Sequence, residues 1–282
     1  MQRLFLVICL SSLFVVAESQ ENNSDLYALT NTNNYVGVSI VDLVDPYLSL
    51  LSYSGLGVRL ESDYNKFFNP AKPVLSSYGR ASSMVAMTIN PGATASIIYV
   101  GADMAWGVLY ENRDFRNFIL KGGGNVNLDF GFKMNSRNVN NPVNIDVSTN
   151  LNAMLDLKYL YPTRKRTLEF GTKIEFPVIG CMFAPYPGLS YYELSSSKSF
   201  FETIHFSSLH NKQGIKQDIS ILVPLNTSTL KFGVRLSELK YMADNYQYRF
   251  NEFSLLFGVT YDYIRFTGKK SNIPVNFISP SK

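Results

Sequence analysis

Residues 143–161 read VNIDVSTNLNAMLDLKYLY, and this stretch decides the fold. Its odd-numbered positions are almost all apolar or aromatic, whereas its even-numbered positions are mostly polar or charged, with Met154 and Leu160 as exceptions. A strand points successive side chains to opposite faces, and a helical period would mix the two sets. The stretch is therefore predicted to be a strand with one apolar face and one polar face.

The same alternation recurs on both sides of this stretch. The apolar sets run from Val126 to Met134, from Leu168 to Phe176, from Leu230 to Leu236 and from Phe253 to Tyr263. Strands of globular proteins usually have about five or six residues, whereas a membrane-spanning strand needs about nine to eleven. These lengths favour a membrane barrel over the alternative of a secreted, soluble β-sandwich.

Clear and weaker segments together predict about twelve strands. They lie at residues 34–42, 54–65, 76–90, 94–111, 115–135, 143–161, 165–178, 187–195, 200–210, 215–225, 228–241 and 248–266. An even number of strands is typical of single-chain bacterial barrels. We therefore expect an all-β, transmembrane, antiparallel up-and-down barrel over residues 34–266, preceded by a flexible lead-in at 20–33 and followed by a tail at 267–282.

The composition agrees with a barrel in lipid. Charged residues make up 17% of the chain and aromatic residues 14%, whereas a soluble domain carries roughly a quarter charged residues. The aromatic side chains are expected to form girdles at the two lipid–water interfaces. The net charge of +4 is small and spread along the chain, so it does not indicate nucleic-acid binding.

The N-terminus has the anatomy of a secretory signal peptide. A short cationic end, Met1 to Arg3, precedes an apolar run from Leu4 to Ala17 that is too short for a comfortable membrane span. A signal peptide is therefore predicted at residues 1–19, with export to the outer membrane of a Gram-negative bacterium. One cysteine, Cys181, then remains beside two histidines, so neither an internal disulfide nor a metal or other cofactor is expected.

The polar positions of the strands are expected to face the lumen. Lipid offers no hydrogen-bond partners, so charged side chains must point inward and the backbone must be paired within a closed barrel. The predicted lumen-lining residues are Arg59, Glu61, Asp63, Asp103, Asp129, Lys133, Asp146, Asp156, Lys158, Glu169, Lys173, Glu175, Lys216, Asp218, Lys231, Arg235, Glu252 and Asp262. Both signs are present, which predicts a lumen braced by ion pairs; the alternative is a polar pathway for a small solute.

One segment, Thr203 to Asn211, has the residue types of a hydrolase. His205 and Ser207 resemble the His-x-Ser strand motif of outer-membrane phospholipases and lipid A deacylases, in which the histidine is the base for the serine. Ile204 and Phe206 are the apolar partners, however, so His205 and Ser207 should face the lumen rather than lipid. Ser208 also stands where the deacylase motif has an asparagine, and we therefore keep this activity as the alternative only.

The chain as a whole resembles a family of Bacteroidales outer-membrane proteins that is classified only as a domain of unknown function. The matching pieces are Asp45-Pro46-Tyr47-Leu48-Ser49, Tyr53-Ser54-Gly55-Leu56-Gly57, Asn135-Ser136-Arg137-Asn138 with Asn141-Pro142-Val143, Pro177-Val178-Ile179-Gly180, Ser190-Tyr191-Tyr192-Glu193, and His205-Phe206 to His210-Asn211. The resemblance implies an outer-membrane barrel and no catalytic residue, because the histidine-rich stretch has no assigned role in that family.

These observations predict a barrel with periplasmic termini, surrounded by outer-membrane lipid, that acts as a structural protein or as a small-solute pore. Phe266 is expected to be the terminal aromatic residue that barrel assembly reads, although the tail from Thr267 to Lys282 follows it. The sequence names neither a solute nor a protein partner.

Overall fold

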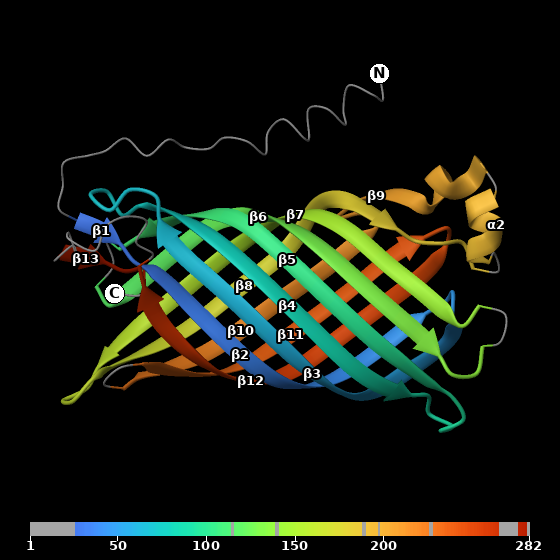
Figure 1. Cartoon of the computed structure of the whole chain (residues 1–282), viewed down its shortest axis with the longest axis horizontal. Helices are drawn as coiled ribbons and strands as arrows, with labels where there is room; N and C mark the ends of the chain where they lie inside the picture. The colour runs from blue at the N-terminus through green and yellow to red at the C-terminus, as the bar shows by residue number, and fades with distance from the viewer. Residues whose placement is uncertain are drawn as a thin grey trace, which may run out of the picture.

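The structure is a computed structural model that describes residues 26–113, 116–138, 141–187, 190–196, 198–225, 228–264 and 276–280. Ten long strands form a closed antiparallel barrel (Figure 1). They are β2 (Thr30–Asp45), β3 (Ser49–Phe67), β4 (Leu75–Ile89), β5 (Ser96–Asn112), β6 (Phe118–Asn135), β7 (Val143–Pro162), β8 (Thr167–Phe183), β10 (Lys212–Pro224), β11 (Thr229–Ala243) and β12 (Tyr246–Tyr263). The predicted fold class is confirmed.

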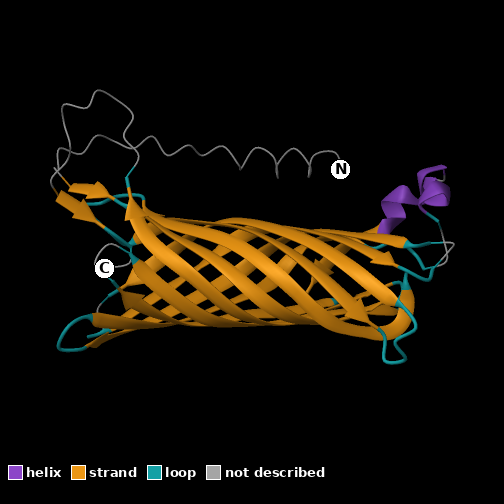
Figure 2. Cartoon of the chain, turned by 60° about the horizontal axis from the view of Figure 1, so that its bottom comes forward, coloured by secondary structure: helices purple, strands orange, loops and turns teal. Residues whose placement is uncertain are grey.

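Consecutive strands are neighbours all round the barrel, and β12 closes it by pairing with β2. The first and last barrel strands therefore begin and end at the same end of the barrel, which we call the terminal mouth (Figure 2). The opposite end is the loop mouth. It carries the short turn at residues 46–48 and the long connection between β8 and β10.

Ten of the predicted strands correspond to the ten barrel strands, and the other two fall in the connection between β8 and β10. The strand predicted at 187–195 is wrong, because helix α2 (Tyr191–Ser196) lies there. Its first turn is a capping box: the Ser190 backbone N–H donates to Glu193 Oε2 at 2.7 Å, and the Glu193 N–H donates to Ser190 Oγ at 3.3 Å. The segment at 200–210 holds the 3-10 helix η1 (Lys198–Thr203) and the short strand β9 (Ile204–Ser208).

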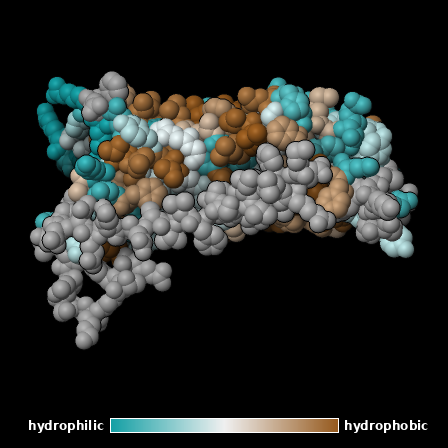
Figure 3. All heavy atoms as spheres, turned by 90° about the horizontal axis from the view of Figure 1, so that it is seen from above, coloured by the Kyte–Doolittle hydropathy of each residue, from teal (hydrophilic) through white to brown (hydrophobic). Residues whose placement is uncertain are grey.

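The outer face of the barrel is apolar. On β12, Phe253, Leu255 and Phe257 are exposed and alternate with the buried Glu252 and Ser254. Figure 3 shows hydrophobic residues gathered over the middle of the barrel, with hydrophilic residues toward its ends. Such a band needs a lipid environment, as in other membrane barrels. Within the described residues, no helix is long and apolar enough to span a membrane.

Tyrosines lie on both the outer face and the lumen face of the barrel, so the predicted interfacial girdles contain only some of them. Tyr261 and Tyr263 are exposed beside the terminal mouth. Tyr35 and Tyr78, in contrast, are buried in the lumen, where the Tyr35 hydroxyl donates to Asp63 at 3.4 Å and Lys173 donates to the Tyr78 hydroxyl at 3.3 Å. Their rings fill lumen space while their hydroxyl groups bond to charged neighbours.

The two ends of the described chain meet beside the terminal mouth. Strand β1 (Leu26–Ala28) pairs in parallel with β13 (Asn276–Ile278), and β2 begins at Thr30, four residues before the expected start of the barrel. From the tail, Ser279 Oγ donates to Asp262 at 2.9 Å, and the Pro280 carbonyl accepts from Lys121 Nζ at 3.0 Å. The predicted signal peptide and Phe266 lie outside the described residues.

A charge placed in the middle of the outer face is expected to destabilise the folded barrel. Leu255 lies near the centre of β12 and is paired with Val38, so Leu255→Arg should lower the free energy of unfolding in lipid vesicles by about 2–4 kcal/mol. Leu50→Arg, beside the turn at 46–48, should cost only about 0–1 kcal/mol. Equal losses for the two variants, measured by denaturant titration, would contradict the lipid-facing assignment.

Candidate functional site

Three buried arginines cross the lumen at mid-height: Arg59 on β3, Arg80 on β4 and Arg235 on β11. Each sits between carboxylates that come from other parts of the wall. Together with these carboxylates and one lysine they form what we call the charge belt. Its members are Arg59, Arg80, Lys216, Arg235, Glu61, Asp103, Glu175, Asp218 and Glu252.

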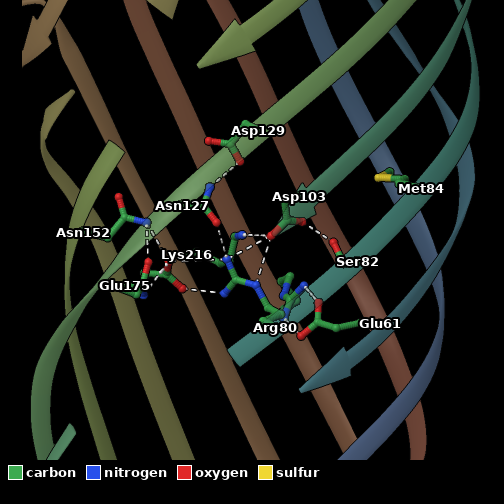
Figure 4. A network of polar contacts seen from close by, with 12 residues as sticks. Glu61, Arg80, Ser82, Met84, Asp103, Asn127, Asp129, Asn152, Glu175 and Lys216 are labelled. Carbon is green, nitrogen blue, oxygen red and sulfur yellow. Dashed lines mark hydrogen bonds and ion pairs between the residues drawn. The ribbon is translucent and has the colours of Figure 1, made fainter. Parts of the chain in front are cut away.

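Arg80 is the centre of the belt (Figure 4). Its guanidinium is 2.9 Å from Asp103 and 2.5 Å from Glu175, and it also donates to the Asn127 side chain at 3.1 Å. The carboxylate of Glu175 accepts a further bond from Asn152 at 2.7 Å. Because β4 and β8 are separated by three strands of the wall, the pair of Arg80 with Glu175 spans the lumen.

The other two arginines extend the belt to the remaining strands. Arg59 makes a bidentate pair with Glu252, at 2.6 and 2.7 Å. Arg235 binds Asp218 on β10 at 2.6 and 2.8 Å, and it forms a second pair with Glu61 across the lumen. Bidentate arginine–carboxylate pairs are directional as well as strong, so the belt fixes these side chains in place.

On the terminal side of the belt, a second set of ion pairs fills the lumen. Lys158 is 2.8 Å from Glu169, and Lys121 is 2.8 Å from Glu111. Lys231 donates to the Tyr35 hydroxyl. A cavity of only about 50 Å³ remains among these residues and the nearby Pro280.

On the loop side of the belt lies a larger cavity of about 170 Å³, which we call the chamber. Charged groups in its lining include Arg59, Lys133, Asp146 and Lys212. Lys133 pairs with Asp146 at 2.5 Å and with Asp45 at 2.8 Å. The chamber thus combines bound charges with aromatic walls, to which Tyr99, Tyr241, Tyr248 and Phe250 contribute.

A buried cluster of aromatic and aliphatic side chains, which we call the cap, lies at the loop mouth. The turn at 46–48 brings Tyr47 and Leu48 against Val41, Leu43 and Tyr53 in one buried cluster. The Tyr47 ring contacts the Tyr191 ring edge-on at 5.6 Å, and the Tyr191 hydroxyl donates to Asn144 at 2.9 Å. Burial and the nearby Asp45 carboxylate raise the pKa of Tyr47 to about 12, so its hydroxyl stays neutral.

Within the described residues, Lys212 resembles Lys231 and differs from the other lumen cations, because it makes no ion pair. Its ammonium donates to Ser148 Oγ at 2.9 Å and to Asn150 Oδ1 at 3.0 Å. Among the described residues, no carboxylate lies within ion-pair distance of it. Asp129 instead accepts bonds from the same Ser148 and Asn150, at 3.2 and 3.0 Å. Lys212 is therefore a buried cation on the chamber wall that is bonded only to neutral groups.

The structure brings most of the predicted lumen residues into the belt and its flanking sets. Asp156, Asp129 and Asp262 are half-buried, and of these Asp129 adjoins the belt by accepting a bond from Asn127 at 2.6 Å (Figure 4). Sequence reasoning missed Arg80, Lys121, Glu111, Asp45 and Lys212. Arg80 shares its face with Tyr78 and Ser82, but the positions of the opposite face nearest to it, Gly79, Ala81 and Ser83, are too small or too polar to reveal an apolar side.

The histidine-rich segment does not assemble a catalytic pair. His205 and Ser207 both point inward from β9, while Ile204 and Phe206 are exposed. No hydrogen bond joins His205 to Ser207 among the described residues: His205 Nε2 lies 3.5 Å from Asp244, and Ser207 Oγ is buried without a partner. The neighbouring Ser208 hydroxyl contacts His210 Nδ1 at 2.5 Å on the exposed surface.

Comparison with known proteins identifies a family. The family described as protein of unknown function DUF3316 matches residues 4–270. No curated protein matches the chain. Similar solved structures include the outer membrane protease OmpT from Escherichia coli, with 8% identity, a TM-score of 0.44 and coverage of 84% of this chain and 96% of that one.

Two further solved structures are outer-membrane proteins. The translocator domain of the autotransporter NalP from Neisseria meningitidis has 10% identity and a TM-score of 0.41, with coverage of 92% of this chain and 96% of that one. An outer membrane channel from Pseudomonas putida F1 has 8% identity and a TM-score of 0.34, with coverage of 88% and 98%.

Removing a belt arginine is expected to be strongly destabilising. Arg235→Met leaves Glu61 and Asp218 without their main partner in the barrel interior, which should cost about 3–5 kcal/mol of unfolding free energy. Lys240→Met is the matched control, because Lys240 and its partner Glu238 are 42% and 51% exposed and such pairs contribute at most about 1 kcal/mol. Adding Glu61→Gln and Asp218→Asn to Arg235→Met should recover most of the loss. A loss no larger than that of the control would refute the paired state of the belt.

Proposed function

The chain belongs to the DUF3316 family of proteins of unknown function, and we propose that it is an outer-membrane barrel that binds a small ligand inside its lumen and does not conduct. The proposal places it in the outer membrane of a Gram-negative bacterium, with both termini in the periplasm and the loop mouth facing outward. Export through a signal peptide at residues 1–19 is part of the same proposal.

The charge belt is the observation that carries this function. Arg80 with Glu175, and Arg235 with Glu61, each connect strands on different sides of the lumen, and the side chains of both arginines are fully buried. A solute crossing at this height would have to separate such pairs, and a separated buried charge costs several kcal/mol. The belt therefore acts as a wall, and a small-solute pore is the less favoured use of this lumen.

The chamber is the part of the lumen suited to a ligand. Belt residues such as Arg59 and Glu175 line one side of it, and its lining residues Tyr99 and Phe250 pack against the cap cluster. Ligand sites typically combine apolar and aromatic walls with a few placed polar groups. The chamber has the rings of Tyr99 and Phe250 and the ammonium of Lys212, which is bonded only to uncharged groups.

The lipid hydrolase is not favoured as a function. Its nucleophile and base would be Ser207 and His205, which face inward and are not bonded to each other. We therefore propose a protein without enzymatic activity, whose surroundings are lipid and whose site is the chamber.

Planar-bilayer recording of the refolded protein tests the closed lumen. Wild-type barrels whose gel mobility shifts on heating should give no unitary conductance steps. The double variant Arg80→Ser and Glu175→Ser removes one neutral pair from the belt and should produce steps, because a lumen-spanning bridge is lost without leaving an unpaired charge.

The matched control is Lys158→Ser with Glu169→Ser, a pair on the terminal side that lies outside the belt. This control variant should give no unitary conductance steps. Stable steps from the wild-type protein, at the frequency of the Arg80 and Glu175 variant, would show that the belt is no wall.

A further inference from the structure

The barrel wall has one weak seam, between β8 and β10 near the loop mouth. The other ladders of the ten-stranded wall hold between 13 and 17 residue pairs each, whereas the ladder of β8 with β10 holds 7 and stops at the pair of Glu175 with Lys216. Beyond it, β8 pairs with β9 from Ile179 onward. Residues 176–178 of β8 therefore face residues 209–215 without ladder pairing.

Pro177 explains why the ladder stops there. In the register of Glu175 with Lys216, Pro177 would stand opposite Gly214, but proline has no backbone N–H to donate. The other edge of β8 is disturbed at the same height, because its pairing with β7 shifts register between Leu151 and Asn152. A Cβ atom added at Gly214 would lie 3.4 Å from Pro177 Cδ, so a side chain introduced at this position would contact Pro177 across the seam.

The chamber lies directly behind the seam. Phe176, Pro177, Gly214 and Ile215 belong to its lining together with the lumen residues. Separating β8 from β10 at these positions would connect the chamber to the outside while breaking no ladder pair. Elsewhere in the described wall, the same movement would break a run of backbone hydrogen bonds, which has no replacement in lipid.

The chemistry differs between the two sides of the seam. On the outside, Phe176, Ile179 and Ile215 are 40%, 43% and 47% exposed. On the inside, Lys212 has only neutral partners, and Lys216 lies 3.6 Å from Asp103, which is shared with Arg59 and Arg80. The seam thus has an apolar outer surface and two lysines, Lys212 and Lys216, on its inner side.

We propose that the ligand is an anionic amphiphile, a single acyl chain ending in a carboxylate, which enters from the lipid through this seam. The carboxylate binds Lys212 and Lys216, and the chain lies along Phe176 and Ile215. The chamber volume of about 170 Å³ equals roughly six water molecules, so it takes the head group and leaves most of the chain in the seam. This inference rests on the proposed closed, ligand-binding lumen and adds the ligand class and its route.

Titration calorimetry with dodecanoate as the probe, on the refolded protein in a non-ionic detergent, tests the ligand. Dodecanoate should bind at one site per barrel, and dodecyltrimethylammonium, which has the same chain and the opposite charge, should not. Lys212→Gln should weaken dodecanoate binding about tenfold or more, as expected for one charge-assisted hydrogen bond. Lys240→Gln, an exposed lysine at the same mouth, should leave the Kd unchanged.

A cross-link tests the route. In a Cys181→Ser background, Pro177→Cys with Gly214→Cys should slow uptake of radiolabelled dodecanoate from vesicles when oxidised and restore it when reduced. The matched cross-link, Gly171→Cys with Ser220→Cys, joins a ladder pair of the same two strands and should not slow uptake. Gly214→Leu, which fills the seam without a disulfide, should also slow it.

The outcomes separate the two proposals. Uptake at the wild-type rate with the seam locked or filled overturns the lateral route. Absence of saturable dodecanoate binding, or binding unaffected by Lys212→Gln, overturns the ligand assignment. Neither result tests the proposal that the lumen is closed. That proposal is refuted only if the wild-type protein conducts.

Discussion

The rest of this structure depends on one constraint: hydrocarbon offers no partner to a backbone N–H or C=O group. Strands can meet it only by pairing on both edges, which forces the sheet to close. Closure in turn sorts the side chains, because alternate residues must face either lipid or lumen. The charged side chains of β12 and β3, such as Glu252 and Arg59, point into the lumen because the outer face of the same strands lies in hydrocarbon.

A ten-stranded barrel then has to fill its lumen with what the strands point inward. Many aliphatic side chains face outward, and apart from clusters such as the cap, the lumen is filled mainly by arginines, carboxylates, asparagines and tyrosines. Buried ions are tolerated only when their hydrogen-bonding capacity is met. Arg80 meets it with two carboxylates and an amide, and Glu175 meets it with an arginine and two asparagines. The lumen is therefore better described as a polar core than as a channel.

Period-two alternation made the fold predictable, because every barrel strand repeats the same two-faced pattern. Its failures were local. Ser190 and Glu193 form a helix cap that a search for strands overlooks. Arg80 faces inward from a part of β4 where the outward residues are glycine, alanine and serine, so the alternation is hidden there. The pairing of Arg80 with Glu175, or of Arg235 with Glu61, was beyond sequence reasoning. It depends on strand tilt and on which strands stand opposite each other, and neither is encoded in the alternation.

The interrupted ladder at Pro177 is an exception to this constraint, and its position explains why the barrel tolerates it. Ile215, at the seam, pairs on β11 with Glu238, which is exposed on the outer face, and the adjacent Gln213 is exposed as well. Polar outward side chains place this height at the edge of the apolar band, where water and lipid head groups can satisfy backbone groups that the ladder leaves free. The same height suits the carboxylate of an amphiphile, whose chain then runs toward the middle of the band. The interrupted ladder between β8 and β10 is thus tolerated at the same height at which the proposed ligand would enter.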